Sequence, residues 1–130
     1  MHQIIKNISK FYGFSFLCGI TISVLCFIHL PQQTDLGSIP NFDKIVHFIM
    51  YFALSTTFVL ESLIVYSKSG KSNLRFYIIA FLLSAVFGWL IEEFQGMLDY
   101  RSKDVFDWLF DVAGSFTACT LIGLIRLAFR

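Results

Sequence analysis

Charged residues are scarce in this chain of 130 residues. Asp, Glu, Lys and Arg make up 15% of the sequence, whereas they make up about 25% of an ordinary soluble domain. Hydrophobic residues, in contrast, make up 56%. Because a surface with so few charges would not keep a small domain in solution, the composition excludes an ordinary soluble protein.

The low contents of proline and cysteine and the low net charge exclude three further classes. Two Pro beside sixteen Phe exclude a disordered or collagen-like chain. Cys18, Cys26 and Cys119 are odd in number and lie in apolar runs, so no disulfide framework is predicted. A formal net charge of +1 gives no basis for a nucleic acid partner. The remaining class is a small multi-pass membrane protein.

Four long apolar runs predict four transmembrane helices, at about residues 11–30, 43–66, 75–98 and 105–127. Each run provides the roughly 20 residues that a membrane-spanning helix needs. The runs lack the two-residue alternation of membrane β-strands. The first run is longer than the apolar region of a signal peptide and has no small-residue cleavage site. We therefore expect one all-α domain over residues 1–130, a bundle of four transmembrane helices joined by short loops.

Basic residues in the connections predict the orientation of this bundle. With the N-terminus in the cytoplasm, seven Lys and Arg fall on the cytoplasmic side and three on the outer side. The cytoplasmic set is Lys6, Lys10, Lys68, Lys71, Arg75, Arg126 and Arg130, and the outer set is Lys44, Arg101 and Lys103. Both the N- and C-termini are therefore predicted to be cytoplasmic. Most acidic residues fall on the outer side, where they would attract cations or cationic ligands.

Polar residues recur at helical spacing at the outer ends of three predicted helices. The three sets are Asp43, His47 and Tyr51; Glu92, Gln95 and Asp99; and Asp104, Asp107, Asp111 and Gly114. Spacings of three and four place each set on one helix face. Arg101 lies in the short connection between the last two helices. Three polar stripes are thus predicted to meet at one end of the bundle.

Glu92, Asp107 and Asp111 lie at a depth where an ionisable group costs roughly 2.5–3.5 kcal/mol and normally faces a partner or a wet cavity. His47, one turn into its helix, is a candidate partner, and Arg101 could bridge two carboxylates with its planar guanidinium. We expect a buried His–Arg–carboxylate network, which could be a functional site or a purely structural one.

Other polar residues have simpler structural interpretations. Asp43 and Asp104 lie near helix N-termini, where a carboxylate can cap free N–H groups. Lys44 is typical of an interfacial anchor. Glu61 is predicted to be a solvated residue at the inner end, with Lys68 within reach.

The region 43–114 resembles the VanZ-like family of bacterial membrane proteins. Residues 43–47 (DKIVH) match the Asp-Lys-x-x-His segment that opens the family's second helix, and residues 92–95 (EEFQ) match its Glu-x-x-Gln at the end of the third. Residues 101–114 (RSKDVFDWLFDVAG) match an Arg, a short stretch and an Asp, ending in Asn and Gly. Asp111 departs from that pattern, since it stands where the family usually has Asn.

The resemblance implies a multi-pass protein of the bacterial inner (cytoplasmic) membrane that works at the cell envelope. It links the chain to a family named for low-level resistance to the glycopeptide teicoplanin. A lipid or a cell-wall precursor is the ligand class that fits such a location.

One hypothesis is an enzyme acting at the boundary of membrane and water. His47 would be the general acid or base, oriented by Asp43 or Asp107, and Glu92 would be a second acid–base group. Arg101 would hold an anionic group such as a lipid phosphate. In a variant of this hypothesis, His47, Glu92 and Asp107 bind a divalent metal ion such as Zn²⁺ or Mn²⁺.

Two non-enzymatic functions stay open. In the first, an accessory protein binds a lipid head group, a cationic ligand or another envelope protein. The ligand-binding residues would be Asp43, Lys44, Tyr51, Gln95, Arg101, Asp104 and Asp111. In the second, buried His, Glu and Asp relay protons in a small transporter. Small residues four apart, at 84 and 88 and at 114 and 118, allow close helix packing, either within the chain or in a homo-oligomer.

Overall fold

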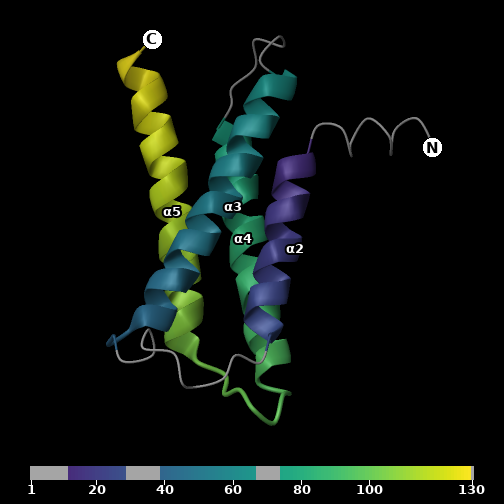
Figure 1. Ribbon diagram of the computed structural model, residues 1–130. Coiled ribbons are helices and arrows are strands. Elements are labelled where there is room, and N and C mark those ends of the chain that lie inside the picture. The colour runs from purple at the N-terminus through teal and green to yellow at the C-terminus, as the bar shows by residue number, and fades with distance from the viewer. Residues whose placement is uncertain (1–11, 29–38, 67–73, 130) are drawn as a thin grey trace, which may run out of the picture.

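The computed structural model describes residues 12–28, 39–66 and 74–129. This part of the chain forms four α-helices and no strand, so the predicted all-α fold is confirmed (Figure 1). The helices are α2 (Gly13–Phe27), α3 (Phe42–Tyr66), α4 (Leu74–Gln95) and α5 (Val105–Ala128).

The helices α3, α4 and α5 are long and apolar enough to cross a membrane. Their 25, 22 and 24 residues span about 33–38 Å, more than the roughly 30 Å of a hydrocarbon core. The 15 residues of α2 span only about 22 Å. Its last residue is Phe27, because Ile28 is already extended. The prediction for residues 11–30 is therefore longer than α2, and residues 11, 29 and 30 lie outside the described residues.

The interior of the bundle contains many polar residues beside two apolar clusters, and apolar residues cover its outside. The buried polar side chains are Ser15, His47, Ser55, Glu61, Ser62, Ser84, Glu92, Gln95, Asp107, Asp111 and Ser115. Large apolar side chains such as Phe16, Ile64 and Leu124 are exposed on the outer faces. In lipid, apolar side chains face a matching solvent while polar groups must find partners inside the protein. This arrangement is that of a membrane protein.

Small residues let the helices approach closely, and α3 packs most extensively against α5. A Cβ added to Gly114 would lie 2.3 Å from the carbonyl oxygen of Phe48, so only glycine fits at this crossing. One turn away, the Ser55 hydroxyl donates to Ser115 Oγ at 2.6 Å and lies 2.8 Å from Ser84 Oγ. Close packing by small residues thus occurs within the chain.

The end of α4 returns the chain toward the start of α5. The helix ends at Gln95, three residues before its predicted end at residue 98. Met97 N and Leu98 N each donate to the carbonyl three residues back at 3.1 Å, which tightens the chain into a turn. The ends of α2 and α4 and the starts of α3 and α5 therefore lie together, at the bottom of Figure 1.

Candidate functional site

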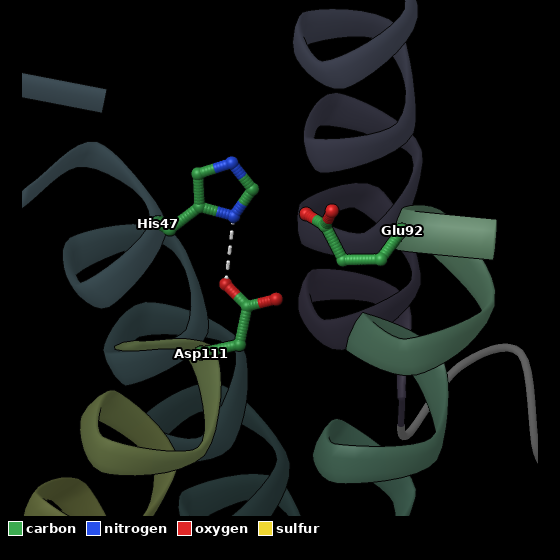
Figure 2. A group of neighbouring side chains, drawn as sticks. All are labelled: His47, Glu92 and Asp111. Atoms are coloured by element: carbon green, nitrogen blue, oxygen red, sulfur yellow. Dashed lines mark hydrogen bonds and ion pairs between the residues drawn. The ribbon is translucent and has the colours of Figure 1, made fainter. Parts of the chain in front are cut away.

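Ionisable side chains from three helices meet at this end of the bundle. His47 comes from the start of α3, Glu92 from the end of α4, and Asp107 and Asp111 from the first turns of α5. We call these four residues the histidine site. All four are buried, and Glu92 and Asp111 are only 1% and 0% exposed. Figure 2 shows the carboxylates of Glu92 and Asp111 directed toward the space beside the His47 ring.

Both carboxylates of α5 lie beside the His47 ring, one at each of its nitrogens. Nδ1 is hydrogen-bonded to Asp111 Oδ1 at 2.8 Å, and Nε2 lies 3.8 Å from Asp107 Oδ2, within ion-pair distance. Asp107 and Asp111 are four residues apart, so they lie on the same face of α5. Asp111 therefore orients the ring and can exchange a proton with it.

A lysine links this site to the surface of the bundle. Lys44 Nζ lies 3.1 Å from Asp104 Oδ2, 3.3 Å from Asp107 Oδ1 and 3.5 Å from Asp43 Oδ2. The sequence predicted that Arg101 bridges two carboxylates, but the structure gives that role to Lys44. The reason is position: Lys44 is one turn before His47 on α3, which packs directly against α5.

Asp104 caps the N-terminus of α5. Its Oδ1 accepts a hydrogen bond from Phe106 N at 2.8 Å, and its Oδ2 pairs with Lys44. The backbone hydrogen bond, followed by the Lys44 ammonium, lowers the pKa of Asp104 below its ordinary value. The backbone N of Asp104 donates in turn to Glu92 Oε2 at 3.1 Å. The cap therefore also positions a residue of the histidine site.

Two buried carboxylate oxygens have no hydrogen-bond partner among the described residues, Glu92 Oε1 and Asp111 Oδ2. Such an oxygen costs about 1–3 kcal/mol, and more when the group is charged. Glu92 also lies at the C-terminal end of α4, where the helix dipole disfavours an acid. These oxygens can accept a proton, a donor group of a ligand or a cation.

Gly88 makes the space that Asp111 occupies. A Cβ at position 88 would lie 2.7 Å from Asp111 Oδ2, so any larger residue would displace this carboxylate. Glu92 lies one turn further along α4, on the same face as Gly88. The spacing of Gly88 and Glu92 was therefore a sequence signal for this site. The small residue at position 88 had been interpreted only as a helix-packing residue.

Within the described part of the chain, two groups of three side chains lie close enough to hold a metal ion. They are His47, Glu92 and Asp111, and Asp43, Asp104 and Asp107; within each group the ligand atoms lie within 4.8 Å of one another. The second group surrounds Lys44, which already supplies positive charge. In the first group, neither Glu92 nor Asp111 forms an ion pair with a described Lys or Arg. The ligand set predicted from the sequence contained Asp107, and the structure places Asp111 there instead.

Tyr51 and Gln95, two predicted ligand-binding residues, lie at the margin of the site. Tyr51 is fully buried, one turn after His47 in α3. Its ring packs against that of Phe87, with 6.0 Å between the ring centroids. Gln95 Nε2 donates to the carbonyl oxygen of Cys26 at 2.8 Å. Gln95 therefore fastens the end of α2 to α4 and does not reach toward His47.

Arg101 lies in the connection between α4 and α5, and its side chain forms no ion pair with a described carboxylate. Lys103, in the same connection, pairs with Glu93. Arg101 and Glu92 both lie near enough to Cys26 to act electrostatically on its thiol. The Arg101 guanidinium thus lies at the same end of the bundle as the histidine site, without an ion pair to a described carboxylate.

Glu61 is a structural residue that the sequence analysis misassigned. It is 9% exposed, at the end of the bundle opposite the histidine site. Its carboxylate accepts hydrogen bonds from Phe14 N at 2.9 Å, from Ser15 N at 3.1 Å and from the Ser15 hydroxyl. The prediction of a solvated Glu61 is wrong because Glu61 caps the N-terminus of α2. Its expected partner Lys68 lies outside the described residues.

The histidine site thus combines a ring hydrogen-bonded to one carboxylate and flanked by a second with two acceptor oxygens directed at a common space. Such a site can transfer protons, bind a polar group or bind a cation. No protein-family model, curated protein or solved structure matches this chain.

Proposed function

We propose that this chain is a VanZ-like protein of the bacterial inner membrane that binds the phosphate-bearing head group of a lipid or a lipid-linked cell-wall precursor. The head group would lie at the histidine site, on the outer side of the membrane. By the same resemblance, its cellular role would concern the envelope and glycopeptide resistance.

Four membrane crossings with both termini in the cytoplasm fit this proposal. Exposed apolar side chains such as Phe16 and Leu17 give α2 a surface suited to lipid. At the end of the bundle opposite the site, the described basic residues include Arg75 and Arg126, as expected for a cytoplasmic side.

Arg101 is the observation that carries the proposal. At the site end, Lys44 and Lys103 are engaged with carboxylates, whereas the Arg101 side chain makes no ion pair within the described ranges. A guanidinium can bind two oxygens of one phosphate in a planar, bidentate geometry. It would hold that phosphate at the end of the bundle where the histidine site lies.

An apolar groove supports a lipid over a water-soluble ligand. The groove has a volume of about 570 Å³ between α2, α3 and α4, and its lining includes Gly19, Leu54 and Leu83. An acyl or prenyl chain attached to the head group could occupy this space without contacting water. The ligand would then contact the bundle both at its end and along its side.

Binding of matched lipids to the full chain in mild detergent tests the proposal by native mass spectrometry. The probes are phosphatidic acid against diacylglycerol, and a polyprenyl phosphate against the free polyprenol, which differ only in the phosphate. We expect retention of the phosphorylated member of each pair. Arg101→Gln should weaken its binding about tenfold, because one charged hydrogen-bonding group is lost.

Lys103→Gln is the matched control, since it removes the same charge from the same connection. We expect it to bind the phosphorylated lipids as the wild type does, because Lys103 is paired with Glu93. Equal losses in Arg101→Gln and Lys103→Gln would show attraction by general charge and would refute the proposed role of Arg101. Equal binding of phosphorylated and unphosphorylated lipids would refute the ligand class.

Acid–base catalysis is a second candidate, favoured by the Asp111 carboxylate that orients the His47 ring and by the Asp107 carboxylate beside it. Phosphate release from a polyprenyl diphosphate would measure it. Release by the wild type that His47→Gln abolishes, while Lys103→Gln preserves it, would support an enzyme. No release above the rate without protein would rule out this reaction and leave the binding function.

A further inference from the structure

We infer that His47, Glu92 and Asp111 form a binding site for one divalent transition-metal ion, with Zn²⁺ as the first candidate. The inference deepens the proposed function, on which its biological meaning rests, because such an ion would hold the phosphate together with Arg101. The metal site itself can be tested without any lipid.

Geometry is the first support. The His47, Glu92 and Asp111 ligand atoms all lie within 4.8 Å of one another. Metal–ligand bonds of about 2.0–2.2 Å place two ligands of one ion up to about 4 Å apart. Figure 2 shows the Glu92 side chain directed toward His47 and Asp111. A small rotation of this side chain would bring the ligand atoms from up to 4.8 Å apart to the separation of about 4 Å that one ion requires.

The unpartnered oxygens are a second and independent support. Glu92 Oε1 and Asp111 Oδ2 belong to residues that are 1% and 0% exposed, and neither has a hydrogen-bond partner in the described part of the chain. Gly88 holds open the space in which the Asp111 carboxylate lies. An ion coordinated by both residues would satisfy both oxygens.

The surroundings of His47 match those of a metal ligand. If Nδ1 binds the ion, Nε2 carries the proton; Asp107 Oδ2 lies 3.8 Å from it, so a small movement of the Asp107 side chain would complete a hydrogen bond. A ligating histidine usually donates its other ring N–H to a carboxylate, which orients the ring and raises its basicity. Asp107 is itself held by Lys44 at 3.3 Å. Asp107 is therefore a positioning residue.

Charge distinguishes this site from the neighbouring acidic group. Asp43, Asp104 and Asp107 surround the ammonium of Lys44, which already occupies the place of a cation. In the group of His47, Glu92 and Asp111, the two carboxylates have no ammonium between them, and the His47 ring is the one member that could carry positive charge. A divalent ion would balance these carboxylates and make the site attractive to a phosphate.

The donor set indicates the kind of ion. One imidazole nitrogen with two carboxylates suits Zn²⁺, Mn²⁺ or Fe²⁺ better than Ca²⁺ or Mg²⁺, which prefer oxygen ligands alone. Three protein ligands leave a coordination position open, as in catalytic rather than structural zinc sites. That position would take an oxygen of the ligand.

Metal analysis of the full chain tests the inference. The protein is purified with a tag free of histidine, stripped with a chelator, reloaded with Zn²⁺ or Mn²⁺ and analysed for bound metal by mass spectrometry. We expect a single ion per chain and loss of this ion in His47→Gln and Asp111→Asn. Asp107→Asn should keep the ion but weaken its affinity about 10- to 100-fold.

Glu92→Gln and Glu93→Gln form the matched pair of variants. They make the same chemical change at adjacent positions, one in the site and one in the exposed pair with Lys103. Only Glu92→Gln should lose metal affinity, and size-exclusion chromatography shows whether both variants remain folded. No metal on the wild type, or equal affinity in both variants, would overturn the metal site. A wild type that binds phosphorylated lipid but no metal would refute this inference alone, whereas a wild type that binds metal but none of the phosphorylated lipids would refute only the proposed function.

Discussion

Glu61 and Glu92 are both buried glutamates on membrane-length helices, at opposite ends of the bundle. Both oxygens of Glu61 accept hydrogen bonds from the first turn of α2. Glu92 lies at a helix C-terminus, and only its Oε2 has a described partner. Both oxygens of Glu61 are therefore engaged in structural hydrogen bonds, whereas Glu92 Oε1 can still accept one from a ligand.

This difference separates structural from functional burial. A carboxylate at a helix N-terminus gains from the dipole and from free N–H groups, so its burial is stabilising. Glu92 gains one such N–H, that of Asp104 at the start of α5, but it lies at the C-terminus of its own helix and its Oε1 has no described partner, so its burial is more expensive. We therefore expect variants at the Glu61 end to change stability, and variants in the histidine site to change binding more than stability.

Along α5, structural and non-structural positions can be compared in the same way, and a structural one gives the largest expected loss of stability. Gly114→Ala should strongly destabilise the protein, because its Cβ would lie 2.3 Å from the Phe48 carbonyl oxygen and would force α3 away from α5. Overpacking of this kind costs about 1–3 kcal/mol or more. Thermal unfolding in detergent measures the loss, together with loss of any ligand at the histidine site.

Gly123→Ala is the control for that change, at the other end of the same helix. A Cβ at position 123 has nothing within 4 Å, so this variant should unfold within a degree or two of the wild type. Similar losses in the two variants would mean that the α3–α5 crossing does not depend on Gly114.

Glu61→Ala is expected to have the next largest effect. It removes the acceptor for Phe14 N and for both donors of Ser15, which leaves buried donors without a partner at a cost of about 1–3 kcal/mol. Limited proteolysis should show α2 becoming accessible before the other helices. Glu92→Ala, compared under the same conditions, should lower the unfolding temperature less.

A reversed order of these two variants would contradict the comparison. If Glu92→Ala destabilised the protein more than Glu61→Ala, the histidine site would be mainly a structural network. Its free oxygens would then have no functional meaning.

Much of this fold was predictable because membrane helices are specified by long apolar runs. The bounds of α3 and α5 differ from the predicted ranges by a residue, whereas α2 is shorter and α4 ends earlier. Helix ends depend on local hydrogen bonds, such as the turn at Met97 and Leu98, which apolar content does not encode.

The site was predictable in part for a similar physical reason. Helical periodicity placed His47, Glu92 and Asp111 on inward faces at one end, and the structure brings them together. Periodicity does not fix how two helices rotate against each other, and this rotation decides which charges meet. For this reason Lys44, and not Arg101 as expected, bridges two carboxylates. The capping of α2 by Glu61 was not predicted for the same reason.

The smallest effect is expected from Asp104→Asn, which tests whether the cap of α5 acts through charge. The pKa of Asp104 is lowered by the Phe106 N–H and by Lys44, so the folded protein holds the ionised form more tightly than the unfolded chain does. Its contribution to stability is therefore complete above the ordinary pKa of about 4 and is lost as the pH falls through the lowered value. Asn keeps the capping oxygen but does not titrate. Unfolding temperatures measured from pH 7 down to pH 3 should thus start slightly lower in Asp104→Asn, and the gap should narrow below pH 4. Equal unfolding temperatures of Asp104→Asn and the wild type over this range would show that the cap works through its hydrogen bond alone.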